Sequence, residues 1–216
     1  MPTTFRKSTL REYFESIVIA VILALFVRTW VVQAFKIPTG SMENNLLIGD
    51  HLLVNKFVFG PTASSVDRAV LPVRDIRRGD IVVFKYPDEP ERDFIKRVIG
   101  LPGDTLELKS KKVYVNGQPL DEPYVHFLTP TTEGAEVTSQ DVRERYGPVT
   151  VPNDQYFVMG DNRDNSSDSR VWGTVQHDFI KGKALIVWWS RAPTDGWNIL
   201  DWFKSIRWSR FFQIVR

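Results

Sequence analysis

The sequence of 216 residues contains no cysteine, which excludes disulfide bonds, thiolate catalysis and cysteine-ligated metals. Its three histidines, His51, His126 and His177, lack the spacing of imidazole metal ligands, and this argues against a histidine metal site. A large excess of one charge is also missing, because 28 lysines and arginines face 26 aspartates and glutamates. Such a balance gives no basic field for nucleic acid, so we expect no nucleic acid as a partner. Any chemistry must come from hydroxyls, amines and carboxylates.

Long apolar runs are scarce, and the one uninterrupted run lies near the N-terminus. Residues 17–27 read IVIAVILALFV, and beyond Arg28 and Thr29 the apolar sequence resumes as far as Phe35. Because a membrane-crossing helix needs about 20 mostly apolar residues, we predict one transmembrane helix over 14–35 with Arg28 near its far end. The alternative is a cleavable signal peptide, but no A-x-A site closes the run.

The tail before this helix is basic, which predicts that the N-terminus stays inside and the remainder of the chain faces outside. The length of the chain suits one main domain with a small second one. We divide it as follows: a tail at 1–13, the helix at 14–35, a catalytic β domain at 36–108 and 153–190, an insertion or small second domain at 109–152, and an aromatic-basic segment at 191–216.

The body of the chain has the periodicity of strands, since short apolar runs alternate with Gly-Asp, Pro and Asn-Gly turns. A mainly β fold with a smaller β-rich insertion is therefore predicted. Asn116-Gly117 predicts a two-residue hairpin turn. Six runs are the strand candidates: residues 51–59, 81–86, 94–101, 112–115, 155–160 and 183–189.

The end of the chain reads WNILDWFKSIRWSRFFQIVR from Trp197 onward. Interleaved aromatic and basic residues are typical of an interfacial helix or an edge seated on a membrane. Tryptophan is also good core material, so a terminal element packed on the core explains the same pattern. The sequence leaves both interpretations open.

Ser41 follows Pro38 and Gly40 in a bend that can expose a hydroxyl, and a nucleophilic serine needs a base. His51 is the nearest histidine, but its place at the head of an apparent strand favours a structural role. A lysine base must be neutral, whereas at a pKa of about 10.4 only roughly one amine in 2,500 is neutral at pH 7. Burial in an apolar strand lowers that pKa. Lys96 and Lys56 both lie in such strands, and these criteria barely separate them.

The polar block at residues 160–170, GDNRDNSSDSR, superficially suggests a calcium loop. Its loop glycine is missing, and Trp172 stands where a bidentate glutamate is needed. We expect instead an ordered network of hydrogen bonds that could orient an active-site amine.

Four ordered blocks stand out along the chain: IPTGSM at 37–42, GDHLLVNKFVFG at 49–60, RRGDIVVFKYP with FIKRVIGLPGD at 77–104, and GDNRDNSSDSRVWG at 160–173. Together these blocks resemble the type I signal peptidases, or leader peptidases, of the serine-lysine dyad class. One departure is Phe94, where some relatives have a tyrosine whose hydroxyl could help to orient the lysine.

The resemblance implies roles that the residues alone leave open. Ser41 would be the nucleophile and Lys96, not Lys56, the base, with the Ser41 amide and the Thr39 hydroxyl as the oxyanion hole. It implies a serine endopeptidase that removes signal peptides after small residues (A-x-A) through an acyl-enzyme, without a metal or organic cofactor. The remaining implied roles are a bond from Ser166 to the Lys96 amine, a pair between Asp168 and Arg170 that holds the loop, and substrate pockets lined by Ile37 and Ile95.

The same resemblance implies a monomer in the bacterial cytoplasmic membrane, with one membrane pass and the catalytic domain on the periplasmic face. Its partners would be exported preproteins and membrane lipid. Two alternatives stay open: an organellar inner-membrane peptidase or another serine-lysine protease, and a non-enzymatic membrane-anchored β module. Cleavage of a preprotein by wild type and by Ser41→Ala would discriminate among them.

Overall fold

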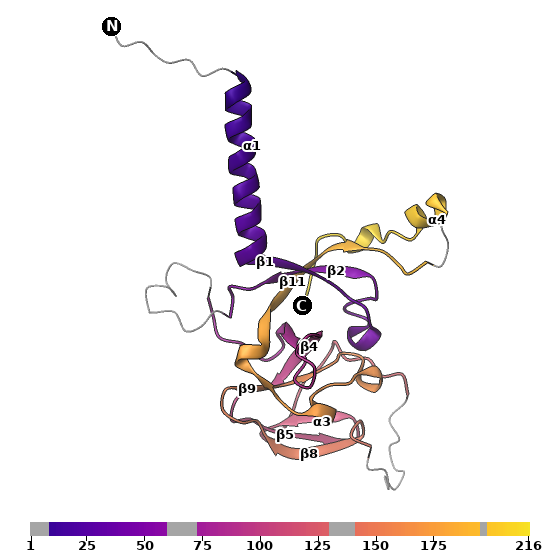
Figure 1. Cartoon of the computed structure of the whole chain (residues 1–216). Coiled ribbons are helices and arrows are strands. Elements are labelled where there is room, and N and C mark those ends of the chain that lie inside the picture. Colours follow the sequence, from indigo (N-terminus) through magenta and orange to yellow (C-terminus); the bar gives the residue numbers. More distant parts are fainter. Residues whose placement is uncertain (1–8, 60–72, 130–140, 195–197) are drawn as a thin grey trace.

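A computed structural model describes residues 9–59, 73–129, 141–194 and 198–216. A single long helix, α1, stands away from a body made of two antiparallel sheets (Figure 1). The smaller sheet lies at the end of the body far from α1, and the C-terminal helix α4 lies at the end near it. The mainly β fold predicted from the sequence is therefore confirmed.

The N-terminal helix is shorter at its far end than predicted. It runs as α1 (Thr9–Phe26) and continues as a π-helical turn, η1 (Val27–Val31). The next residues form a strand, β1 (Val32–Lys36), which pairs with β2 (Asp50–Asn55), so the prediction of helix up to Phe35 is wrong. Pairing with β2 satisfies the backbone hydrogen-bonding groups of β1. These residues therefore form a strand, although their apolar sequence continues that of the helix.

α1 buries none of its residues against the body, and its apolar side chains are exposed. Its first half carries three charged residues, Arg11, Glu12 and Glu15. No helix in the described part of the chain is both long and apolar enough to count as a membrane span.

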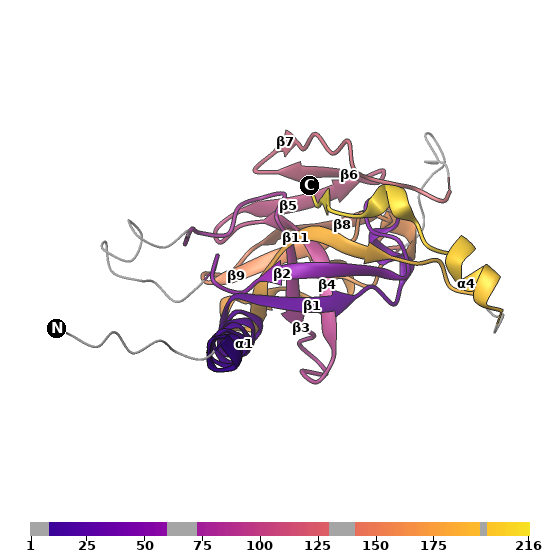
Figure 2. The same ribbon diagram turned by 90° about the horizontal axis from the view of Figure 1, so that it is seen from above.

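The larger sheet has eight strands, in the order β1-β2-β11-β3-β4-β9-β10, with β12 beside β11. Figure 2 shows β1, β2 and β11 running side by side. It contains five of the six predicted strands, and it adds β1, β10 and β12. The bounds not yet given are β3 (Ile81–Lys85), β4 (Asp93–Gly100), β9 (Gln155–Met159), β10 (Val175–Gln176), β11 (Ile180–Ser190) and β12 (Gln213–Ile214).

The smaller sheet has four strands in the order β7-β6-β5-β8. The predicted hairpin turn joins β6 to β7, and Asn116 and Gly117 have φ angles of 52° and 80°, as a type I′ turn requires. This sheet overlaps the polar region predicted as an insertion, although β5 begins earlier in the chain. The strands are β5 (Thr105–Lys109), β6 (Lys112–Val115), β7 (Gln118–Pro119) and β8 (Arg145–Thr150).

The two sheets share part of their core. Ile99 and Phe157 of the larger sheet pack in one cluster with Leu106, Leu108 and Val113 of the smaller. Each is 3% exposed or less, so separating the sheets would expose several large apolar side chains, each worth about 1.5–3 kcal/mol. The smaller sheet is therefore fixed against the strands that carry the candidate site.

The C-terminal segment forms neither a continuous helix nor an ordinary core element. It contains α4 (Ile199–Lys204), a 3-10 turn η5 (Trp208–Arg210) and β12, which pairs with β11. Asp201 in the first turn of α4 favours the start of a helix, but the helix is only six residues long. Large apolar side chains of this segment remain exposed: Leu200, Trp202, Phe203, Trp208, Phe212 and Ile214.

Candidate active site

The turn after β1 places Ser41 at the body's interior. Thr39 is extended, with φ −131° and ψ 157°, and the chain then folds into a 3-10 helix, η2 (Gly40–Met42). Ser41 is 7% exposed, whereas Met42 beneath it is completely buried. The first N–H groups of such a helix lack intrahelical acceptors, so the Ser41 amide is suited to donate to a ligand.

β4 brings Lys96 to this turn. Its Nζ lies 2.6 Å from the Oγ of Ser41, a contact between residues 55 positions apart in the chain. Lys96 is 4% exposed, and its Nζ also lies 5.6 Å from the centre of the Phe94 ring. The sequence-predicted nucleophile and base thus lie within hydrogen-bonding distance of each other.

The surroundings of Lys96 disfavour its charged form. Burial lowers the pKa of the amine from 10.5 to about 8, although the carboxylates of Asp168 and Asp161 oppose the shift. At pH 7 a pKa near 8 leaves roughly one amine in ten neutral, compared with roughly one in 2,500 for a free lysine. The site therefore supplies a neutral amine beside a hydroxyl, which is the requirement for a lysine general base.

The two competing bases lie elsewhere. The Nζ of Lys56 donates to the carbonyl oxygen of Thr29 at 2.9 Å, so this amine binds the N-terminal helical turn. His51 is half-buried on β2, where its ring contacts that of Trp188 at a centroid distance of 6.0 Å. The structure thus separates Lys96 from Lys56, which the local sequence did not.

The polar loop at residues 160–170 holds the serine turn from behind. The backbone N–H of Asn162 donates to the carbonyl oxygen of Ser41 at 3.1 Å, and its side-chain amide donates to that of Gly40 at 3.2 Å. Gly160 approaches so closely that an added Cβ would lie 2.5 Å from the Ser41 carbonyl oxygen and 2.3 Å from the Ser166 hydroxyl. Only glycine allows this contact.

Asp168 and Arg170 form a buried, two-pronged ion pair within the loop. Both guanidinium contacts measure 2.8 Å, and Arg170 also donates to the carbonyl oxygen of Arg163. Asp168 additionally accepts from the N–H of Gly160 at 3.0 Å. Burial would raise the pKa of Asp168, but the hydrogen bonds and charge of Arg170 outweigh it and hold that pKa below its usual value.

Ser166 is buried in the same loop, but its contacts differ from those expected. Among the described residues its hydroxyl forms no hydrogen bond of regular geometry, so the structure does not join it to Lys96. Its hydroxyl does help to lower the pKa of Asp168. Ser166 therefore lies beside Asp168 without a hydrogen bond of regular geometry to it.

A second ion pair at the loop was missed from the sequence. Arg97 donates to both carboxylate oxygens of Asp161 at 2.8 and 2.7 Å, and Asn45 donates to Asp161 at 2.6 Å. Arg97 is 2% exposed. The signal in the sequence was the pair of adjacent basic residues in FIKRVIGL. Strand alternation sends these two side chains to opposite faces, and a buried arginine needs a carboxylate partner.

Two further pairs tie the loop to the smaller sheet, one at the turn between β5 and β6 and one in the segment between β7 and β8. Arg163 pairs with Glu122, and the Nζ of Lys111 lies 3.1 Å from a carboxylate oxygen of Asp164. Together with the pairs above, each aspartate from 161 to 168 accepts from a basic side chain. The block expected to form a hydrogen-bond network does form one.

A cavity of about 500 Å³ opens at the Ser41–Lys96 pair. Ile95 and Phe94 form part of its apolar lining, and Thr39 lies exposed on its rim. The Phe94 ring is stacked on that of Tyr86 at a centroid distance of 4.5 Å, which fixes the wall where a tyrosine hydroxyl is missing. The cavity thus combines a hydroxyl, an amine and apolar walls.

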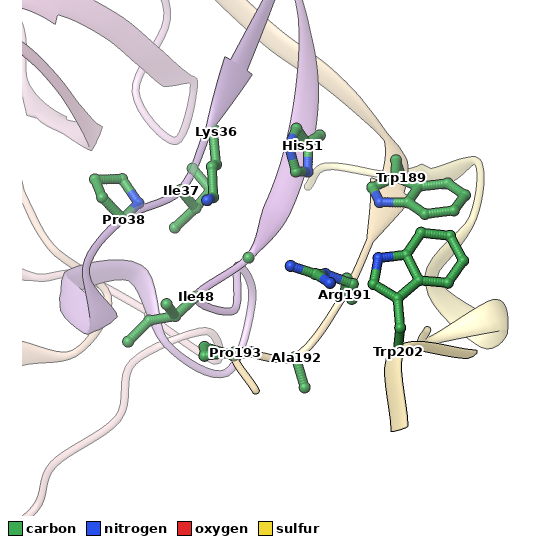
Figure 3. A pocket seen from close by; sticks show the side chains of 11 residues that line it. Lys36, Ile37, Pro38, Ile48, His51, Trp189, Arg191, Ala192, Pro193 and Trp202 are labelled. Atoms are coloured by element: carbon green, nitrogen blue, oxygen red, sulfur yellow. The ribbon is translucent and has the colours of Figure 1, made fainter. Parts of the chain in front are cut away.

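Ile37 does not line that cavity. It is 2% exposed and packs in the core with Met42 and Leu52. Its remaining surface faces a second cavity, of about 580 Å³, whose lining also includes Lys36 and Trp189 (Figure 3). The two expected pocket residues, Ile37 and Ile95, therefore face different cavities.

The donor set of the site fits acyl transfer. Among the residues that the structure describes, no group of histidine and carboxylate side chains could hold a metal ion. Acyl transfer requires a nucleophile, a base and an oxyanion site, and the site has a buried hydroxyl, an amine of lowered pKa and backbone N–H groups at the start of a helix.

Comparison with known proteins agrees with this chemistry. The model of the family described as "Signal peptidase, peptidase S26" matches residues 10–189. A signal peptidase I of Pseudomonas aeruginosa is 40% identical over 212 residues, which cover 86% of this chain and 74% of that protein. A signal peptidase I of Bacillus subtilis subsp. natto is 37% identical over 178 residues, covering 82% of this chain and 87% of that protein. The chain therefore belongs to the signal peptidase I family of serine endopeptidases, peptidase family S26, whose members remove signal peptides.

Proposed function

We propose that Ser41 is the nucleophile and Lys96 the general base that carry out this cleavage. The observation that supports the pair most strongly is the 2.6 Å separation of Nζ and Oγ at a lysine whose pKa is about 8. The neutral amine takes the hydroxyl proton as Oγ attacks the scissile carbonyl carbon. The resulting ammonium then protonates the leaving amine as the C–N bond breaks, which leaves an ester on Ser41.

Hydrolysis of the ester completes the reaction, and Lys96 again acts as the base. Lys96, neutral again after it has protonated the leaving amine, takes a proton from a water molecule that attacks the ester carbonyl carbon. The proton returns to Oγ as the ester bond breaks, which releases the signal peptide's new carboxyl end and restores the dyad.

The oxyanion formed in both steps is stabilised by the Ser41 N–H and the Thr39 hydroxyl. The start of η2 directs the amide, and the exposed position of Thr39 on the cavity rim supports its part as second donor. A donor of this kind typically contributes about 10²–10³ in turnover. The pair Asp168–Arg170, with Ser166 beside it, acts as positioning machinery for the loop that holds the serine turn.

The substrates are exported preproteins, bound as an extended strand beside β4. Ile95 supplies the small apolar wall that selects a short side chain next to the cleavage point, which fits cleavage after A-x-A. Ile37 contributes from below, by fixing the turn that carries Thr39 and Ser41, since it packs in the core under that turn.

The signal peptidase I family is membrane-associated. In this chain α1 inserts into the bacterial cytoplasmic membrane as a single anchor, with its basic start inside and the β body on the periplasmic face. The exposed apolar side chains of α1 support its insertion. The basic residue Arg11 near its start supports the orientation with the N-terminus inside. Through such an anchor the dyad stays close to emerging signal peptides, which raises their effective concentration.

Cleavage of a purified preprotein tests the dyad. Ser41→Ala and Lys96→Ala should each lower turnover by about 10⁴-fold or more, because each removes one of two groups that act as a unit. Lys56→Ala is the matched control, since its amine binds the Thr29 carbonyl away from the site, and it should keep wild-type turnover. A Lys96→Ala enzyme with near-normal turnover would disprove the assignment of the base.

A further inference from the structure

The second cavity, of about 580 Å³, is basic and aromatic (Figure 3). Lys36 and Arg191 reach into it from opposite sides, and Trp189 and Trp202 form one wall. Among the described residues that line it, none is acidic. The cleavage reaction proposed above uses none of these four side chains.

Neighbouring residues on three strands of the larger sheet line this cavity. Lys36 of β1 lies directly opposite His51 of β2, and His51 lies opposite Trp189 of β11. Residues directly opposite one another share a face of the sheet, so these three side chains line the same side. Arg191 follows β11 and closes the row.

The floor of the cavity depends on Gly49, which has a φ of +91°. A Cβ there would lie 2.0 Å from the carbonyl oxygen of Arg191, while the Arg191 N–H donates to the Gly49 carbonyl at 3.2 Å. Glycine thus permits the close approach of two chain segments that positions Arg191. The guanidinium of Arg191 lies 5.9 Å from the centre of the Trp202 ring, which orients it further.

The positive charges of the cavity are not neutralised within the described part of the chain. Neither Lys36 nor Arg191 forms an ion pair with a carboxylate there. Asp50, which precedes His51 on β2, is fully buried and is bound by Arg210 at 2.6 Å. Within the described residues, Lys36 and Arg191 are therefore both available to an anion.

The surface beside the cavity is apolar. Trp202, 40% exposed, belongs both to the cavity wall and to α4, whose other exposed apolar side chains include Leu200 and Phe203. Figure 1 places α4 at the end of the body from which α1 projects. A ligand that fits both surfaces would have an anionic group in the cavity and an apolar part across α4. A phospholipid has both parts, whereas a free phosphate has only the first.

From this charge complementarity and apolar continuity, we propose that the cavity binds the headgroup of an anionic phospholipid. Its phosphate lies between Lys36 and Arg191, and its acyl chains follow Trp202 and the exposed face of α4. Pro38 lines both this cavity and the cavity at Ser41, so a bound headgroup sets the height of the catalytic cavity relative to the membrane surface.

Native mass spectrometry of the full chain in neutral detergent tests the proposal without reference to cleavage. The protein is titrated with phosphatidylglycerol or with phosphatidylcholine of the same acyl chains. Wild type should bind one phosphatidylglycerol more tightly than phosphatidylcholine. The double variant Lys36→Gln/Arg191→Gln should weaken phosphatidylglycerol binding by roughly 10- to 30-fold, as expected for two basic residues at a headgroup.

The matched control removes two charges from the smaller sheet, at the opposite end of the body, as Lys109→Gln/Lys112→Gln. It should keep the wild-type preference, and so should the charge-conserving variant Lys36→Arg/Arg191→Lys. If the double glutamine variant unfolds at a lower temperature than wild type, Lys36→Gln alone keeps the test, because this side chain is exposed, and it should weaken binding by about 5-fold.

Three results would overturn the proposal. Equal affinity of wild type for the two lipids would show that the cavity does not distinguish headgroups by their charge. Unchanged phosphatidylglycerol binding in the glutamine variants would place the lipid elsewhere. Displacement of the lipid by excess inorganic phosphate would identify a site for small anions that makes no use of the apolar face of α4.

Discussion

Replacing Lys96 by methionine should abolish cleavage and at the same time stabilise the protein at neutral pH. Methionine has a similar length and no branch, so it fits the same buried space without a charge. Lys96 is 4% exposed, and its amine contacts the Ser41 hydroxyl and the Phe94 ring. The substitution therefore removes the desolvation that lowers the lysine pKa while leaving the packing of β4 intact.

The magnitude follows from the two pKa values. The amine titrates near 10.5 when unfolded and at about 8 when folded, so between these values the unfolded chain binds a proton that the folded chain does not. Stability of the wild type therefore rises with pH through this window, and the penalty at pH 7 is about 3 kcal/mol. At pH 9.5 it shrinks to about 1 kcal/mol. Loss of the hydrogen bond to Ser41 offsets about 1 kcal/mol at either pH.

We expect Lys96→Met to be more stable than wild type by about 2 kcal/mol at pH 7 and nearly equal to it at pH 9.5. Thermal unfolding of both proteins in the same detergent measures this, and the difference at pH 7 corresponds to roughly 4–8 °C. Other titrating groups cancel because both proteins share them. A stability difference that does not change between the two pH values would refute a lowered pKa at Lys96.

Three further predictions concern the same site. Thr39→Val should lower single-turnover cleavage by about 10²–10³-fold while Thr39→Ser stays active, and a valine variant as fast as wild type would exclude the hydroxyl as an oxyanion donor. Gly160→Ala should slow cleavage because its Cβ would meet the Ser41 carbonyl oxygen at 2.5 Å, and an unchanged rate would show that the loop yields without moving the turn. The rate should fall about tenfold per pH unit below the Lys96 pKa of about 8, and His51→Gln should keep that limb, which a collapse of its rate would contradict.

Much of the fold could be predicted because strand periodicity is local. The run IVVFKY became β3 and the turn at Asn116-Gly117 became a type I′ hairpin, since both depend on neighbouring residues. β1 was missed because its apolar residues continue those of α1, and only pairing with β2, a non-local contact, distinguishes strand from helix there. β8 was missed as a strand because its register with β5 is irregular and its residues are mostly exposed.

The site could be predicted to the extent that its chemistry limits the choice of residues. A lysine base requires an apolar strand, and this reduced the candidates to Lys96 and Lys56. The properties of the two strands could not separate these lysines, because the distance from each amine to Ser41 depends on how β4 and η2 pack. Only the resemblance to the serine-lysine peptidases selected Lys96. The placement of Ile37 away from the Ser41 cavity could not be foreseen either, since it depends on which face of the turn meets the core.

β4 connects catalysis to the integrity of the fold through two adjacent residues. Alternation along the strand sends Lys96 to Ser41 and Arg97 to Asp161 on the opposite face. Asp161 begins the loop whose next residue, Asn162, donates to the Ser41 carbonyl. The proposed base and the support of the proposed nucleophile are therefore both set by one strand, so a shift of β4 would move both together. The buried Arg97, beside the proposed base, fixes through Asp161 the loop that contacts the turn carrying Ser41.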